Sequence, residues 1–113
     1  MAKVKYSPEA QNDLLGIKSY IEDELKNTSA AQRVLKKIID KNKLLETAPQ
    51  IGSPLSSVID IDTDYRFIVA GHYLSFYRYS GNTCFIDRVL YYRREYLSIL
   101  FSEAILQEEN DEK

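Results

Sequence analysis

Residues 65–92 read YRFIVAGHYLSFYRYSGNTCFIDRVLYY, and this stretch decides the fold. It contains three runs that are rich in β-branched and aromatic side chains and that alternate as strands do: YRFIVAG, HYLSFYRYS and TCFIDRVLYY. Residues 71–72 and 81–82, each beginning with glycine, separate the runs by gaps of the size of a tight turn. The stretch therefore predicts a meander of three antiparallel strands.

The first half of the chain has the pattern of one short strand and two helices. KVKY at residues 3–6 alternates charged and apolar side chains, which is typical of a strand. Ser7 precedes a helix predicted over roughly 8–26, in which apolar side chains recur at steps of three or four. A second periodic segment follows the polar break at Asn27 and ends before Pro49, so the two helices form a hairpin.

The remaining segments complete the predicted order of elements. Residues 49–64 are rich in turn formers and indicate a loop, whereas apolar side chains after Tyr92 return to helical spacing. The order is β-α-α-β-β-β-α, which predicts an α+β domain with the helices packed on one face of an antiparallel sheet. We expect residues 1–101 to form a single domain and residues 102–113 an acidic C-terminal tail.

The composition is that of an ordinary globular protein, with 44% hydrophobic and 28% charged residues. A chain of 113 residues suffices for one core, and no apolar run approaches the ~20 residues of a membrane span. Together with a polar N-terminus, this predicts a cytoplasmic protein. Cys84 is the single cysteine and is expected in the core, and His72 is the single histidine and is expected in a turn.

Neither a metal nor a cofactor is expected. One cysteine and one histidine do not supply the ligands of a structural zinc site. DIDTD at residues 60–64 has the alternate aspartates that begin a calcium loop. However, Tyr65 stands where that loop needs glycine, and Gly71 stands where it needs glutamate.

Charge is unevenly distributed along the chain, whose net charge is -2. Residues 102–113 hold five acids and one lysine, a net charge of -4, so the other 101 residues carry +2. A body so weakly basic does not suit a dedicated nucleic-acid-binding protein, although it permits a local basic site.

DRVLYYRREYLSILF at residues 87–101 supplies most of the candidate site. Three arginines and three tyrosines fall within nine residues of it, and these residue types dominate interaction hot spots. Strict alternation along the last strand predicts that one of its faces carries Ile86, Arg88, Leu90 and Tyr92. Tyr91 is expected to pack, and Arg88 either pairs with an acid such as Asp64 or contacts a partner.

The chain resembles the RelE/ParE superfamily, the toxins of type II toxin–antitoxin modules of the plasmid stabilisation type. The resemblance covers residues 3–101 and is most specific in HYLSFYRY and RVLYYRR. It favours the ParE-like branch, in which the middle strand has an apolar residue where RelE-like enzymes have arginine; here that residue is Leu74.

The ParE-like resemblance implies a non-enzymatic toxin that poisons DNA gyrase by binding it. It also implies a cognate antitoxin, whose disordered segment would fold onto apolar grooves beside the helices and the sheet. The target-binding patch that it implies consists of Arg88, Tyr92, Arg93, Arg94 and Tyr96.

Two alternatives stay open. A RelE-like toxin would be a metal-independent endoribonuclease (an mRNA interferase) whose partners are the ribosome and messenger RNA. The catalytic residues that this resemblance implies are Arg66 and Arg93 on the phosphate and Tyr96, or alternatively Tyr92, near the base. The other functional positions of that branch are occupied by Ile68, Leu74 and Ile99. The second alternative is a degenerate member that binds an antitoxin and is not toxic.

Overall fold

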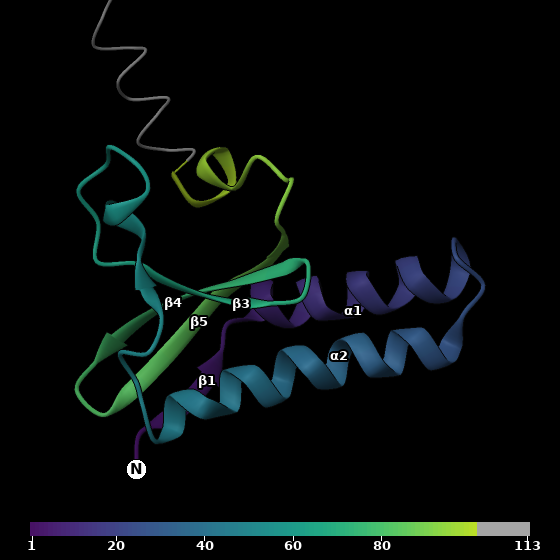
Figure 1. Cartoon of the computed structure of the whole chain (residues 1–113), viewed down its shortest axis with the longest axis horizontal. Coiled ribbons are helices and arrows are strands. Elements are labelled where there is room, and N and C mark those ends of the chain that lie inside the picture. The colour runs from purple at the N-terminus through teal and green to yellow at the C-terminus, as the bar shows by residue number, and fades with distance from the viewer. Residues whose placement is uncertain (102–113) are drawn as a thin grey trace, which may run out of the picture.

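The computed structural model describes residues 1–101, which form a five-stranded sheet packed on two long helices (Figure 1). The main elements are β1 (Lys3–Tyr6), α1 (Pro8–Asp23), α2 (Thr28–Lys43), β2 (Ser53–Pro54), β3 (Arg66–Ala70), β4 (Tyr73–Ser80) and β5 (Thr83–Tyr91). Two 3-10 turns, η1 (Leu44–Glu46) and η2 (Leu55–Ser57), flank β2, and a further helical segment spans residues 96–101. The predicted α+β class and element order are confirmed.

Local capping explains where the helices begin and end. The Ser7 hydroxyl accepts a 2.9 Å hydrogen bond from the Ala10 N–H at the start of α1, and Asn27 caps α2 through the Ala30 N–H in the same way. α1 ends at Asp23, three residues before the predicted boundary. Lys26 then adopts a positive φ of 54°, which turns the chain into the cap of α2.

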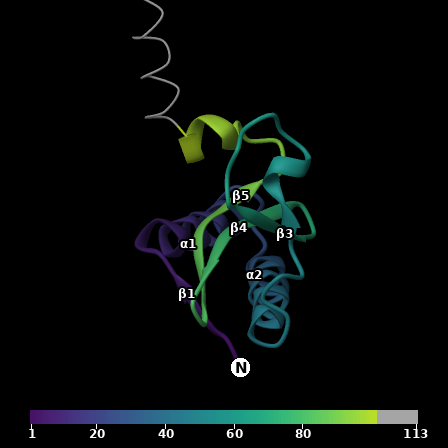
Figure 2. The ribbon, with the colours of Figure 1, turned by 90° about the vertical axis from the view of Figure 1, so that its left-hand side faces the viewer.

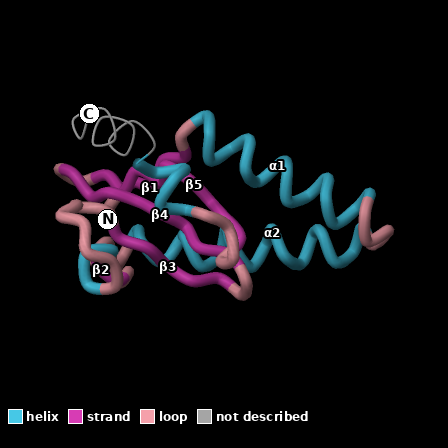
Figure 3. The backbone as a smooth tube through the Cα atoms, turned by 90° about the horizontal axis from the view of Figure 1, so that it is seen from above, coloured by secondary structure: helices cyan, strands magenta, loops and turns pink. Residues whose placement is uncertain are grey.

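The sheet has the strand order β1-β5-β4-β3-β2, which can be followed from above in Figure 3. β1 runs parallel to β5, from Lys3 opposite Thr83 to Tyr6 opposite Ile86, and Figure 2 shows these two strands side by side. The remaining pairs are antiparallel. The loop prediction for residues 49–64 omitted β2, a two-residue edge strand, because proline is a weak strand signal except at an edge.

Side chains are buried on both faces of the sheet. α1 and α2 cover one face, where Ile38, Tyr77 and Ile86 are fully buried. Leu55 and the helical segment 96–101 cover the opposite face, so the final helix does not share a face with α1 and α2 (Figure 1). Within the described residues, no helix combines the length and the apolar character needed to cross a membrane.

A bulge at Asp87 interrupts the alternation of β5. Its neighbours Ile86 and Arg88 lie opposite adjacent residues of β4, so Asp87 has no residue of its own opposite it. Ile86 and Val89 therefore both belong to the core beneath the helices, whereas Leu90 packs on the opposite face. The prediction that Ile86 and Leu90 share a face is wrong, because strict alternation holds only in a regular strand.

Candidate functional site

The end of β5 and the turn that follows it carry most of the predicted contact residues. The Tyr92 N–H donates a 2.8 Å hydrogen bond to the His72 carbonyl, and the Arg94 N–H donates a 2.9 Å bond to the Tyr91 carbonyl. The first bond joins the turn after β5 to the turn between β3 and β4, and the second lies within the turn after β5. The resulting surface, here called the aromatic–arginine surface, consists of His72, Tyr73, Tyr91, Tyr92, Arg93 and Arg94.

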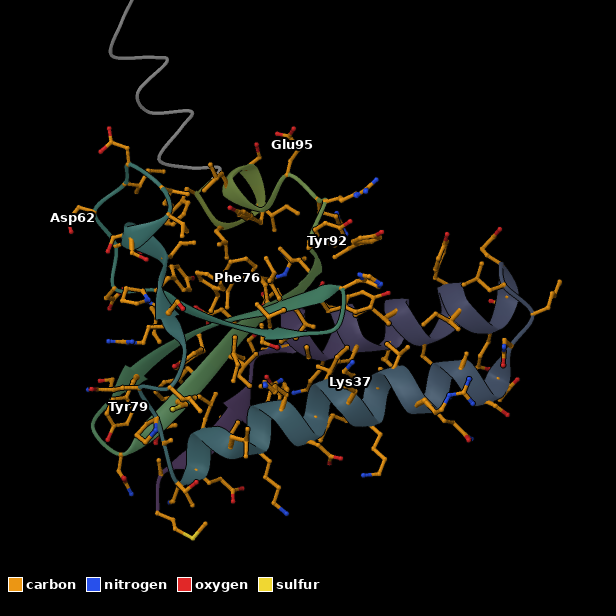
Figure 4. The ribbon with its side chains drawn as sticks, viewed as in Figure 1. Lys37, Asp62, Phe76, Tyr79, Tyr92 and Glu95 are labelled. Carbon is orange, nitrogen blue, oxygen red and sulfur yellow. The ribbon has the colours of Figure 1, made fainter. Side chains whose placement is uncertain are left out.

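The rings of this surface form a continuous series. The Tyr92 ring centroid lies 5.7 Å from that of His72 and 5.1 Å from that of Tyr91, and Tyr91 lies 5.8 Å from Tyr73. Tyr91 and Tyr92 are nevertheless 41% and 43% exposed. The expectation that Tyr91 packs is thus met only in part, because its ring touches its neighbours and also reaches solvent. Figure 4 shows Tyr92 where the chain leaves β5 toward the final helical segment.

Arg93 is oriented by its neighbour Tyr92. Its Nε donates a 2.7 Å hydrogen bond to the Tyr92 hydroxyl, and its guanidinium lies 5.3 Å from the centroid of the Tyr92 ring. Both side chains are exposed. The hydrogen bond and the cation–π contact hold a planar cation beside an exposed ring, which lowers the entropy lost when a partner binds.

Arg94 lies beside a cavity of about 480 Å³ between α1 and the end of the sheet. Its walls include Gly16, Ile17 and Tyr20 from α1 and Tyr73 from β4. Burial, together with the nearby Tyr91 and Tyr20 hydroxyls, raises the pKa of Tyr73 above its ordinary value. Tyr73 is therefore neutral at physiological pH, and the cavity has a predominantly apolar lining that a partner's side chain can fill.

Arg88 pairs with Asp13 of α1 and not with Asp64. Its Nε and Nη2 each donate a 2.8 Å hydrogen bond to the Asp13 carboxylate, which also accepts a 2.9 Å bond from the Val89 N–H. The Asp13 and Arg88 side chains are only 10% and 26% exposed. This pair joins α1 to β5, which gives Arg88 a structural role. Its contact with a partner stays a prediction.

Arg66 lies at the other end of the sheet from the aromatic–arginine surface. Its Nη1 donates hydrogen bonds to the carbonyls of Gly52, at 2.7 Å, and Gln50, at 3.3 Å. Arg66 is paired with Tyr77, which lies four residues along β4 from Tyr73 of the aromatic–arginine surface. At about 3.4 Å per residue, Tyr77 and Tyr73 are about 14 Å apart along the strand. The structure does not bring Arg66 and Arg93 together, and Arg66 is already bonded to the backbone.

Tyr96 packs against the sheet. Its ring stacks on Phe76 with centroids 5.3 Å apart and an interplanar angle of 21°, and it is partly buried. Leu74 and Ile99 belong to the same apolar cluster, and Ile68 is 5% exposed in the core under the helices. The positions at which RelE-like enzymes differ from this chain are therefore packing positions here.

Sequence reasoning missed a group of polar side chains around Asp87. The Tyr65 hydroxyl donates a 2.7 Å hydrogen bond to the Asp87 carboxylate, and Arg78 contacts the same oxygen at 3.0 and 3.1 Å. The guanidinium of Arg78 also lies 5.2 Å from the Tyr65 ring centroid. The one signal in the sequence was an aspartate within a strand of mostly apolar residues. The sequence pattern does not predict the bulge, which turns the Asp87 carboxylate toward Tyr65 and Arg78.

Tyr65 is expected to titrate late. Burial and the hydrogen bond to Asp87 raise its pKa from 10.0 to about 12. Because the pKa is raised on folding, the stability that neutral Tyr65 contributes is complete below pH 10 and is lost as the pH rises toward 12. In an absorbance titration of tyrosinate, Tyr65→Phe should remove a late component. Asp87→Asn should move that component to lower pH.

Tyr79→Phe serves as the control for this titration, because it deletes an exposed tyrosine near the turn between β4 and β5. The late component should survive this change. If Asp87→Asn left the titration unchanged, the assignment to the Tyr65–Asp87 hydrogen bond would be wrong.

Of the comparisons with known proteins, one identifies a family and another shows a shared fold. The profile described as "ParE toxin of type II toxin-antitoxin system, parDE" matches residues 4–96. Eleven chains of solved structures match significantly. One of them, from the "Chromosomal ParDE TA system from P. aeruginosa", has 19% identity and a TM-score of 0.68. That match covers 80% of this chain and 96% of the other, and it shows a shared fold. The comparison with curated proteins finds no significant match.

The family profile spans β1 to the first residue of the final helical segment, and so includes every residue of the aromatic–arginine surface. The chain belongs to the ParE toxin family of type II toxin–antitoxin systems.

Proposed function

We propose that this toxin inhibits growth by binding and poisoning DNA gyrase in the cytoplasm. The aromatic–arginine surface is the observation that carries the proposal. It presents exposed tyrosines with a pre-oriented Arg93, the residue types that contribute most to protein interfaces. A poison that acts by binding needs such a surface and no catalytic group.

Message cleavage has less support. A phosphate in transfer needs several cations around it, and Arg66 and Arg93 are at opposite ends of the sheet. Leu74, at the position of the central arginine of RelE-like enzymes, packs in the apolar cluster with Phe76. Tyr96 stacks on Phe76 and is not free to stack on a base.

We propose further that a cognate antitoxin neutralises the toxin by inserting a segment into the cavity between α1 and the sheet. The cavity is long enough along α1, from Asn12 to Tyr20, for about two turns of helix. Tyr20 is 56% exposed at its rim, an apolar ring that such a segment would cover. Because Arg94 lines the same cavity, an antitoxin seated there would also cover part of the aromatic–arginine surface.

The test uses two assays on the purified protein. Gyrase supercoiling, with trapping of cleaved DNA, should show inhibition, and primer extension in a translating extract should show intact messenger RNA. Arg93→Ala and Tyr92→Ala should each weaken inhibition by roughly thirtyfold, the effect expected for a hot-spot residue.

Lys3→Ala combined with Lys5→Ala is the matched control, since both lysines are exposed on β1 at the other end of the sheet. It should inhibit as the wild type does. Message cleavage that Arg93→Ala abolishes would overturn the proposal in favour of the endoribonuclease. Antitoxin binding without either activity would instead indicate the non-toxic alternative.

A further inference from the structure

The aromatic–arginine surface carries positive charge from two arginines that are neighbours in the sequence, and a lysine from a distant helix lies beside it. Arg93 and Arg94 are exposed in the turn after β5, and the Nζ of Lys37 from α2 reaches Gly71, next to His72. Figure 4 shows Lys37 on the helix beneath the sheet. Glu95 follows Arg94 in the sequence and forms no ion pair within the described residues, whereas Asp13 is already paired with Arg88.

The aromatic rings of the same surface lie among these cations. His72, Tyr91 and Tyr92 are all exposed, and their neighbouring centroids are 5.1 to 6.4 Å apart. Exposed rings interleaved with arginines are the arrangement by which proteins hold unpaired nucleotides. The rings stack on bases, and the cations pair with the phosphates of the strand.

We propose that the aromatic–arginine surface binds unpaired nucleotides of single-stranded DNA. The inference rests on the proposed function and deepens it, because it makes part of the affinity for a gyrase–DNA complex a direct contact with the DNA. Stacking requires bases whose faces are free, so a paired duplex is a poorer ligand than a single strand. The weak net charge of the chain is consistent with this local role, in which the nucleic acid is held together with a protein target.

The experiment measures binding of the purified toxin, without gyrase, to a fluorescent oligothymidylate of about 12 nucleotides by anisotropy at several salt concentrations. An oligouridylate and a DNA duplex of the same length are measured beside it. We expect the oligothymidylate to bind more tightly than the duplex. Tyr92→Ala should weaken this binding roughly tenfold. The double change of Arg93 and Arg94 to alanine should reduce the slope of log affinity against log salt by about 1.4.

Two controls separate this surface from general charge and general aromatic character. The Lys3→Ala, Lys5→Ala pair removes two exposed cations, and Tyr79→Ala removes an exposed ring, all far from His72 along the strands. Both should bind as the wild type does, and circular dichroism spectra that match the wild-type spectrum are required of every variant. Equal losses in the controls, or oligothymidylate binding that Tyr92→Ala does not weaken, would overturn the inference.

The remaining outcomes distinguish the inference from the proposed function. Binding to oligouridylate but not to oligothymidylate would overturn the inference, whereas comparable binding to both supports stacking on bases without regard to the sugar. Gyrase poisoning without any oligothymidylate binding would refute the DNA contact and leave the gyrase target standing. Oligothymidylate binding without gyrase poisoning would refute the gyrase target and leave the DNA contact standing.

Discussion

Asp13→Ala is expected to lower the free energy of unfolding by about 3 kcal/mol. The change removes a carboxylate that accepts two hydrogen bonds from Arg88 and one from the Val89 N–H. It leaves a guanidinium that is only 26% exposed and a backbone donor without their partner. Loss of one partner from a buried pair costs about 3–5 kcal/mol, and the lower value applies because Arg88 keeps some contact with water.

Urea denaturation measures this effect, and Asp40→Ala provides the matched control. Asp40 pairs with Lys36 on the surface of α2, where the side chains are 58% and 75% exposed, so its loss should cost less than about 1 kcal/mol. Adding Arg88→Met to Asp13→Ala should restore part of the stability, because it removes the unpaired charge. Equal losses for Asp13→Ala and Asp40→Ala would show that the Asp13 pair contributes no more than a surface pair.

Gly52→Ala is expected to destabilise the protein by about 2–3 kcal/mol. A Cβ at Gly52 would lie 2.6 Å from the Tyr77 hydroxyl and 2.7 Å from the Phe67 carbonyl oxygen. The hydroxyl cannot simply move away, because it accepts from the Gly52 N–H at 3.0 Å and donates to the Pro49 carbonyl at 2.9 Å. The Phe67 oxygen is backbone in β3, so the strand itself would have to shift.

Gly16→Ala is the control for this prediction. Nothing lies within 4 Å of a Cβ at Gly16, which is inside α1, so alanine should raise stability by up to about 1 kcal/mol through its higher helix propensity. Thermal melting of the two variants should therefore shift in opposite directions. A Gly52→Ala protein as stable as the wild type would show that the contact between the loop and Tyr77 is loose.

The regular elements were predictable because they depend on local patterns. The apolar periodicity that predicts α1 and α2, and the glycine-containing turns on either side of β4, depend only on residues close together in the sequence. The structure confirms these elements. The pairing of Arg88 with Asp13 was not predictable, because it joins residues 75 positions apart. Nothing in a strand's own sequence says which acid of a distant helix will face it.

The candidate site was predictable in composition and not in arrangement. The Arg93–Tyr92 contact joins neighbours in the sequence, and both residues belong to the arginine–tyrosine cluster of residues 87–101. Tyr96 was expected among the contact residues, yet it stacks on Phe76, because the final helical segment covers the second face of the sheet. Lys37 of α2 approaches this surface at Gly71, and the sequence does not place α2 beside that turn. The position of His72 follows from the predicted meander, because antiparallel pairing places the turn between β3 and β4 beside the end of β5.

The parallel pairing of β1 with β5 has a consequence for the synthesis of the toxin. Lys3 lies opposite Thr83, and the Ser7 hydroxyl donates a hydrogen bond to the Asp87 carbonyl. β1 therefore cannot pair until β5 has been synthesised. Such separated contacts slow folding. On the ribosome, a nascent chain that ends before β5 leaves β1 without its neighbour and β4 with a bare edge. Tyr92 and Arg93 follow β5 immediately, so such a nascent chain also lacks these two residues of the aromatic–arginine surface.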